Sequence, residues 1–226
     1  MAGQLYSQFY VLDLDRTLLD TIKATELMRG VIALHDAELA ARLEQRFEDY
    51  SASGESFSMR DFIAENVNED EILQIEAKFK EVAAEWDLLN PGAEEFLAYL
   101  RSREDVGFGI LTYGSALGQT MKIRAVAVLS DVPFLITLET YKGAQIAAWR
   151  EDDGIYSLPA ELGGGRTKKI VFVDDKPFSF KGLPIDCKGY LVKSVYDAGI
   201  EKLPHNVVQV DTLTHVLTAE KQLNVG

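Results

Sequence analysis

The stretch that decides the fold runs from residue 8 to residue 20 and reads Gln-Phe-Tyr-Val-Leu-Asp-Leu-Asp-Arg-Thr-Leu-Leu-Asp. Its first part, Gln8 to Leu14, is apolar and aromatic and ends in acids, which is typical of a buried parallel strand. Asp13 and Asp15 stand where the chain should turn, so both carboxylates can be aimed at one ligand. Open α/β sheets bind ligands at this edge. Two adjacent like charges need a cation, and Mg²⁺ prefers such oxygen ligands.

The rest of the chain alternates predicted strands with predicted helices. Predicted strands cover residues 106–111, 134–138, 169–173, 189–192 and 207–210. Predicted helices run from Asn90-Pro91-Gly92 to about residue 103, over residues 116–128 and over residues 213–223. Strands separated by helices indicate a doubly wound parallel sheet, so the predicted fold class is α/β. Residues 1–20 and 88–226 are expected to form this core domain.

Residues 21–87 interrupt the alternation. Here β-branched runs disappear and apolar residues recur at helical spacing, as in Leu39, Leu43 and Phe47. Ser51-Ala52-Ser53-Gly54 predicts a turn that divides this segment into two halves. Residues 20–90 carry 17 acidic and 7 basic side chains, as expected of a solvated helical unit. We therefore expect an all-helical domain inserted into the α/β core.

The composition limits the possible functions. A formal net charge of −13 argues against extended contact with nucleic-acid backbones. The first apolar run ends at Asp13, too short for a signal peptide or a membrane-spanning helix. Cys187 is the single cysteine, so no internal disulfide calls for an oxidising compartment. The sequence thus favours a cytoplasmic protein that acts on a small molecule, and it leaves the oligomeric state open.

Asp13-Leu14-Asp15-Arg16-Thr17 resembles the Asp-x-Asp-x-Thr signature of the haloacid dehalogenase superfamily, which follows an apolar strand. The resemblance covers most of the chain and implies a helical cap inserted after this motif. It implies that Asp13 attacks phosphorus to form an aspartyl-phosphate, while Asp15 protonates the leaving oxygen and then activates water. The main-chain carbonyl of Asp15 is expected to bind Mg²⁺ and Thr17 to orient the loop. Arg16 departs from the family, which commonly has Gly there, and is a candidate to touch the substrate.

A second segment resembles the phosphate-binding motif of the same family. Residues 109–115 form an apolar strand ending in Thr112-Tyr113-Gly114. Thr112 resembles the family's phosphate-binding Thr or Ser, because a hydroxyl beside free backbone N–H groups suits phosphate oxygens. Tyr113 and Gly114 belong to the same loop and are expected to lie near the substrate.

Two further segments complete the resemblance. Lys142 follows the predicted strand 134–138, in the order of the family's lysine, and is expected to hold the phosphoryl group. Lys168 and Lys169 are its rivals, but they precede the next strand. Asp174 and Asp175 end that strand, and Asp174 resembles the family's metal ligand, with Asp175 supporting it directly or through water.

Together these motifs imply a Mg²⁺-dependent phosphohydrolase acting on a small phosphorylated metabolite. A phosphotransferase or phosphomutase with the same chemistry remains open, as does a catalytically silent binding protein. Asp15 argues against a dehalogenase, because a departing alkoxide needs a proton and a departing halide does not. The sequence does not determine the substrate. Basic residues of the insertion are candidates to contact the leaving group: Lys23, Arg42, Arg46 and Arg60.

Overall fold

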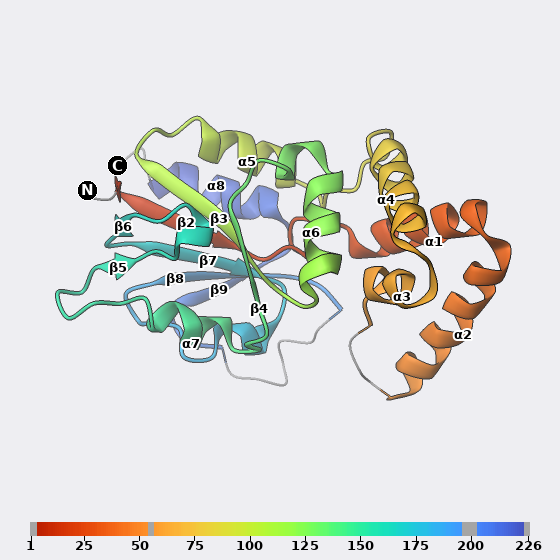
Figure 1. Ribbon diagram of the computed structural model, residues 1–226. Coiled ribbons are helices and arrows are strands. Elements are labelled where there is room, and N and C mark those ends of the chain that lie inside the picture. Colours follow the sequence, from red (N-terminus) through yellow and green to blue (C-terminus); the bar gives the residue numbers. More distant parts are fainter. Residues whose placement is uncertain (1–3, 54–56, 196–202, 224–226) are drawn as a thin grey trace. The chain divides into compact units, whose positions relative to one another are not determined.

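The computed structural model describes residues 4–53, 57–195 and 203–223 of the 226-residue chain. The chain divides into two compact units (Figure 1). An α/β unit comprises Met1–Asp20, Leu89–Tyr113 and Val132–Gly226. A helical unit comprises Thr21–Leu88 and Gly114–Asp131. None of the described helices is long and apolar enough to cross a lipid bilayer.

The α/β unit is built on a fully parallel sheet of six strands in the order β4-β3-β2-β7-β8-β9. The strands are β2 (Gln8–Leu12), β3 (Val106–Tyr113), β4 (Phe134–Thr137), β7 (Ile170–Asp174), β8 (Lys188–Val192) and β9 (Val207–Val210). From β2 the chain builds outward through β3 and β4, and then crosses to β7 on the other side of β2. This doubly wound order confirms the predicted α/β class. It also places the end of β2 at the topological switch point, where such sheets bind ligands.

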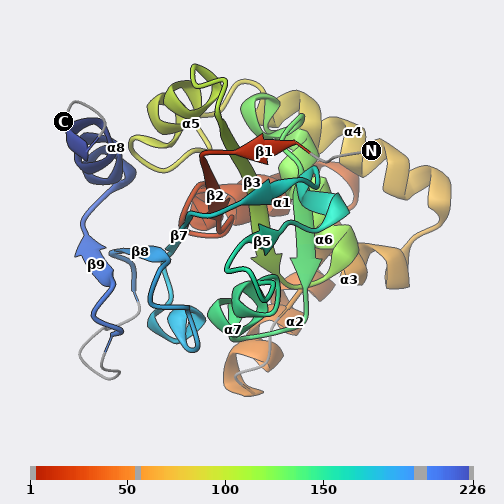
Figure 2. The same ribbon diagram turned by 90° about the vertical axis from the view of Figure 1, so that its left-hand side faces the viewer.

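Alternating side chains along the strands bury both faces of the sheet. On one face, Tyr10 of β2 packs edge-on against Phe96 of α5 (Ala93–Arg101), with ring centroids 5.8 Å apart. Helix α8 (Leu213–Leu223) contacts α5 and also lies beside β9 (Figure 2). On the other face, Phe9 and Phe172 join a core cluster with Ile146 of α7 (Lys142–Ala147). Figure 1 shows α5 and α8 on one face and α7 on the other.

All the predicted strands form, with ends that differ by at most two residues. β2 ends at Leu12, so Asp13 lies just past the end of the strand, whereas β3 continues through Tyr113 and includes Thr112. A small second sheet, in the order β1-β6-β5, was not predicted from the sequence; its strands are Leu5–Tyr6, Arg166–Thr167 and Tyr156–Ser157. Strands of two residues are too short to produce an alternating pattern, which explains the omission.

The helical unit contains α1 (Thr21–His35), α2 (Ala37–Ser53), α3 (Met59–Asn66), α4 (Glu69–Ala83) and α6 (Ala116–Ala125). The predicted turn at residues 51–54 is wrong for Ser51 to Ser53, which are the last residues of α2, and Gly54 lies outside the described residues. The caps explain where the next helices begin. The Ser58 hydroxyl accepts the Asp61 N–H at the start of α3, and Asn68 forms a capping box at the start of α4.

Helix α6 groups with the helical unit, whereas sequence analysis assigned its residues to the core domain. It contacts α3 and α4. Gly118 of α6 permits a close approach, because an added Cβ would lie 2.8 Å from Ser58 Oγ at the start of α3. The predicted helix over 116–128 also ends early, at Ala125, and is followed by a 3-10 turn at Ala127–Leu129.

A buried carboxylate fastens α8 to the sheet. Glu220 is 2% exposed. Its Oε2 accepts hydrogen bonds from Tyr10 Oη at 2.5 Å and Gln8 Nε2 at 3.1 Å, and its Oε1 accepts from Tyr190 Oη at 2.7 Å and Lys188 Nζ at 2.9 Å. Burial by itself raises the pKa of Glu220, but these donors outweigh burial and hold the pKa below its usual range.

We expect Glu220→Leu to lower the free energy of unfolding by about 2–4 kcal/mol, because it leaves two buried hydroxyls without their acceptor. Glu220→Gln, which keeps one acceptor oxygen, is the matched control and should lose less. Since the folded pKa of Glu220 is depressed, its contribution is complete above the unfolded pKa and is lost as the pH falls through the folded pKa. Urea unfolding of wild type and Glu220→Leu across acidic pH measures both effects. If the difference in unfolding free energy between wild type and Glu220→Leu does not decrease toward low pH, this role of Glu220 is contradicted.

Candidate active site

Asp13 lies at the switch point of the sheet, directly after β2. Its N–H donates to the carbonyl of Val173 on β7 at 2.9 Å, which continues the strand pairing by one residue. Its carboxylate is nearly buried, and Thr17 Oγ1 donates to its Oδ2 at 3.1 Å. Lys142 Nζ donates to its Oδ1. Two side-chain donors to the carboxylate and one backbone bond to β7 therefore fix the orientation of Asp13.

The chain turns sharply between Leu14 and Leu19. The N–H groups of Leu18 and Leu19 both donate to the Leu14 carbonyl, at 3.0 and 2.8 Å, and the Arg16 N–H donates to the Leu19 carbonyl at 2.8 Å. Arg16 has φ 64°, alone among the described non-glycine residues in having a positive φ. For a residue with a Cβ this conformation costs about 1–2 kcal/mol. The turn thus gives a physical reason why Gly suits this position better than Arg.

Lys142 is the first residue of α7 and is 2% exposed. Besides Asp13, its Nζ binds Asp174 Oδ2 at 2.8 Å. Burial lowers the pKa of Lys142, but the two carboxylates outweigh burial and raise the pKa above its usual range. Gly143 lets α7 reach this position, because an added Cβ would lie within 2.9 Å of three backbone atoms of residues 180–183. The structure therefore brings Lys142 into the cluster. It leaves the rivals Lys168 and Lys169 exposed, beside the opposite end of β7.

Three carboxylates converge beside Lys142. Asp13, Asp174 and Asp175 each offer an oxygen, and these oxygens lie within 4.8 Å of one another. Asp174 and Asp175 are fully buried, and neither carboxylate oxygen of Asp175 has a hydrogen-bond partner. Three carboxylates against one ammonium leave two negative charges to be neutralised. The donor set therefore fits a divalent cation such as Mg²⁺, which prefers carboxylate oxygens.

The electrostatics of these carboxyl groups point the same way. Burial, opposed by Lys142 and reinforced by Asp174, raises the pKa of Asp13 to about 6. Burial, together with the charges of Asp13 and Asp174, raises the pKa of Asp175 to about 7. Both shifts express the cost of burying several like charges, which a bound cation would offset. Asp174 is oriented separately, because its Oδ1 accepts the Lys176 N–H at 2.8 Å.

The remaining residues of the predicted site follow β2 or lie at the end of β3. Thr112 is on β3, two residues past the Ile110 that pairs with Leu12, and so near the residues that follow β2. Its hydroxyl is buried and has no hydrogen-bond partner, as expected of a group kept for a ligand. Tyr113 follows it and is 37% exposed. The carboxylate of Asp15 is half-buried and lies outside the three-carboxylate group.

No protein-family model matches this chain, and no curated protein matches it in sequence. Solved structures do match its fold. A protein described as a haloacid dehalogenase-like hydrolase from Burkholderia xenovorans is similar with a TM-score of 0.62 and 18% identity, over 96% of this chain and 98% of that one. The chain has the haloacid dehalogenase-like fold.

Two other solved structures with this fold have ligands. CbbY from Rhodobacter sphaeroides, in complex with phosphate, is similar with a TM-score of 0.50 and 17% identity, over 93% of this chain and 96% of that one. YfnB from Bacillus subtilis, described as a hydrolase of this superfamily and bound to magnesium, is similar with a TM-score of 0.50 and 13% identity, over 96% and 99% of the two chains. At these identities the likeness establishes the haloacid dehalogenase-like fold alone.

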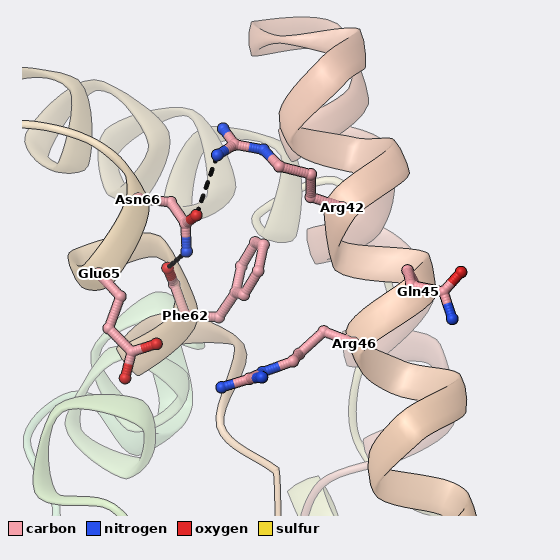
Figure 3. Close-up of a pocket in the computed structure, with 6 residues that line it drawn as sticks. All are labelled: Arg42, Gln45, Arg46, Phe62, Glu65 and Asn66. Carbon is pink, nitrogen blue, oxygen red and sulfur yellow. Dashed lines mark hydrogen bonds between the residues drawn. The ribbon is translucent and has the colours of Figure 1, made fainter.

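The structure of the helical insertion distinguishes the four basic candidates that the sequence left equal. Arg60 is paired with Glu76, and Lys23 donates to the main-chain carbonyl of Asp87. The other two, Arg42 and Arg46, extend from α2 toward Phe62 of α3 and line an open pocket of about 380 Å³ (Figure 3). Arg42 Nη1 donates to Asn66 Oδ1 at 3.1 Å.

Sequence reasoning missed two residues that support the site. Ser194 Oγ donates to the main-chain carbonyl of Asp175 at 3.2 Å. Asn90 donates through its side chain to the turn after Asp13. Asn90 belongs to the Asn90-Pro91-Gly92 segment that marks a predicted helix start. Its side chain, however, binds backbone carbonyls of a distant segment, and such contacts leave no recognisable pattern in the sequence. The Asn90 contacts form only once the turn after β2 and the chain entering α5 lie together.

Proposed function

We propose that this protein is a Mg²⁺-dependent phosphohydrolase that cleaves a small phosphorylated metabolite. One observation carries the proposal: Asp13, Asp174 and Asp175 form a buried carboxylate group around Lys142, and both carboxylate oxygens of Asp175 lack a partner. Hydrogen-bonding groups in a buried site are normally satisfied, so the unpartnered oxygens point to a ligand. Among proteins of this fold, phosphate bound to CbbY and magnesium bound to YfnB support the same reading.

Each residue has a role in the proposed reaction. An oxygen of Asp13 attacks phosphorus, the bond from phosphorus to the leaving oxygen breaks, and Asp15 gives that oxygen a proton. Asp15 then takes a proton from water as the water oxygen attacks phosphorus. The bond from phosphorus to Asp13 breaks and inorganic phosphate leaves. Lys142 and the Thr112 hydroxyl bind phosphoryl oxygens as charge shifts onto them.

The metal would be held by Asp13, Asp174, Asp175 and the main-chain carbonyl of Asp15. When bound, Mg²⁺ neutralises negative charge on the phosphoryl group and on the carboxylates around it. Arg16 in the turn after β2 and Tyr113 at the end of β3, with the backbone at Gly114, are the groups nearest the substrate in this proposal. Thr17 orients Asp13 through its hydroxyl.

A panel of phosphate monoesters tests the proposal, with released phosphate as the readout. We expect hydrolysis of at least one small ester with Mg²⁺ and loss of activity by about 10³-fold or more when EDTA removes the metal. A readout without turnover accompanies it: Mg²⁺ at saturating concentration should raise the Tm of the wild type and have little effect on Asp175→Asn. Absence of both the Tm shift and the hydrolysis across the panel would refute the proposal.

A phosphomutase is the second candidate, because the same residues can pass the phosphoryl group to another hydroxyl instead of water. The measurement that separates the two is the fate of phosphate. Substrate consumed without release of inorganic phosphate identifies the mutase, whereas stoichiometric release identifies the hydrolase. The presence of Asp15 favours either reaction over dehalogenation, because a halide leaves without a proton.

A further inference from the structure

Asn90 holds the turn that carries Asp15. Its Nδ2 donates to the Thr17 carbonyl at 3.0 Å and to the Leu19 carbonyl at 3.3 Å. Its own N–H donates to the Leu18 carbonyl at 2.9 Å. One residue, more than 70 positions away in the chain, therefore binds three consecutive carbonyls of this turn.

The two halves of the turn are fixed differently. Its beginning is fixed from within, because the Leu14 carbonyl accepts two N–H groups. Its end, from Thr17 to Leu19, shares these bonds through the N–H groups of Leu18 and Leu19, but its carbonyls are bound from outside by Asn90. Between the halves lies Arg16 in a left-handed conformation that a side chain disfavours. A turn with such a residue keeps its shape only when its surroundings hold it.

The nucleophile does not depend on Asn90 in the same way. Two of the three contacts that fix Asp13, its N–H bond to β7 and its bond from Lys142, do not involve the turn, and only the third, from the Thr17 hydroxyl, does. Asp15, in contrast, is one residue before Arg16 and forms a bridge with Leu19, whose carbonyl Asn90 binds. Loss of the Asn90 side chain should therefore displace Asp15 more than Asp13.

We infer that Asn90 is a positioning residue that holds Asp15 where it can give a proton to the leaving oxygen. The inference rests on the proposed phosphohydrolase function, and it concerns a residue outside the four motifs. Loss of the Asn90 side chain should therefore have a selective kinetic effect. A misplaced proton donor slows only those reactions whose leaving group needs the proton.

The test compares two esters of different leaving groups, methyl phosphate and 4-nitrophenyl phosphate. The parameter is kcat/KM, which covers the steps up to departure of the leaving group and excludes the later hydrolysis. For Asn90→Ala we expect kcat/KM to fall by about 100-fold with methyl phosphate and by less than about 3-fold with 4-nitrophenyl phosphate. Asn90→Gln keeps the amide on a longer arm and should show the same bias, at about 10-fold for methyl phosphate.

Asn206 provides a matched control in the same α/β unit. Its Nδ2 also donates to two main-chain carbonyls, those of Pro184 and Cys187, each at 2.8 Å. Asn206→Ala thus removes the same number of side-chain bonds away from the site. It should leave the ratio of kcat/KM for the two esters within about 2-fold of wild type, even where it lowers the Tm.

Asp15→Asn serves as the reference that separates the inference from the proposed function. A strong bias against methyl phosphate in Asp15→Asn, with equal losses on both esters in Asn90→Ala and Asn90→Gln, overturns the role of Asn90 and leaves the proposed function standing. Absence of the bias in Asp15→Asn itself overturns the assignment of Asp15. A bias shared by Asp15→Asn and Asn90→Ala, and absent from Asn206→Ala, supports the inference.

Discussion

Asp13→Asn is expected to lower kcat for phosphate-ester hydrolysis by about 10⁴-fold or more, because an amide oxygen is a poor nucleophile toward phosphorus. The substitution is close in shape and retains an acceptor for the Thr17 hydroxyl. Lys142 keeps its bond to Asp174, so the buried ammonium stays paired. The fold should therefore survive, and the loss should lie in the chemical step.

Released phosphate measures this loss, and circular dichroism with thermal unfolding checks the fold. Asp105→Asn is the control, because Asp105 is an exposed aspartate of the same α/β unit, just before the start of β3. It should retain full activity. Asp13→Asn with unchanged kcat would exclude Asp13 as the nucleophile and with it the proposed mechanism, whatever the metal dependence.

Lys142→Met is expected to have the second largest effect, and to lower both the catalytic activity and the free energy of unfolding. Removing the ammonium leaves Asp13 and Asp174 buried without their cationic partner, which we expect to cost about 3–5 kcal/mol of unfolding free energy in the metal-free protein. Loss of the positive charge from the proposed phosphate site should lower kcat/KM by about 10²–10³-fold. Methionine preserves much of the length and apolar bulk of the lysine stem, so the change is mainly one of charge.

Urea unfolding and phosphate release measure the two effects of Lys142→Met. Lys168→Met is the matched control, since Lys168 is exposed near the beginning of β7 and should change the unfolding free energy by less than about 0.5 kcal/mol. Equal activities of Lys142→Met and Lys168→Met would remove Lys142 from the site. Mg²⁺ should still raise the Tm of both variants, because Asp175 remains in both to bind the metal.

Much of the fold follows from local sequence patterns. The strand at Gln8–Leu12 and those at 170–174 and 188–192 are apolar runs of about five residues, and such runs are recognisable because both faces of a parallel sheet are buried. Local sequence patterns do not predict the features of the fold that depend on tertiary contacts. Ser51 to Ser53 have turn-forming residue types but continue α2, and α6 groups with the helices because Gly118 permits close packing.

Some residues of the candidate site were likewise predictable from local sequence patterns, and others were not. Asp13, Thr112 and Asp174 were predictable, because each follows or ends an apolar strand, and parallel strands bring their carboxyl ends to one edge. Chain order favours Lys142 over Lys168 and Lys169, and the contacts of Lys142 with two carboxylates agree with it. Asn90 and Ser194 gave no signal, because their partners are backbone carbonyls that carry no residue identity.

The sequence by itself determined the paired acids at Asp13 and Asp15, the order of the strands along the chain and the helical character of the insertion, because each depends on residues close together in the chain. Tertiary structure alone decided three other features. It left Asp175 without a hydrogen-bond partner, enclosed Lys142 between two carboxylates, and set Arg16 in a left-handed turn bound by Asn90. Burial and contacts between distant segments arise only when the sheet assembles, so no local pattern encodes them.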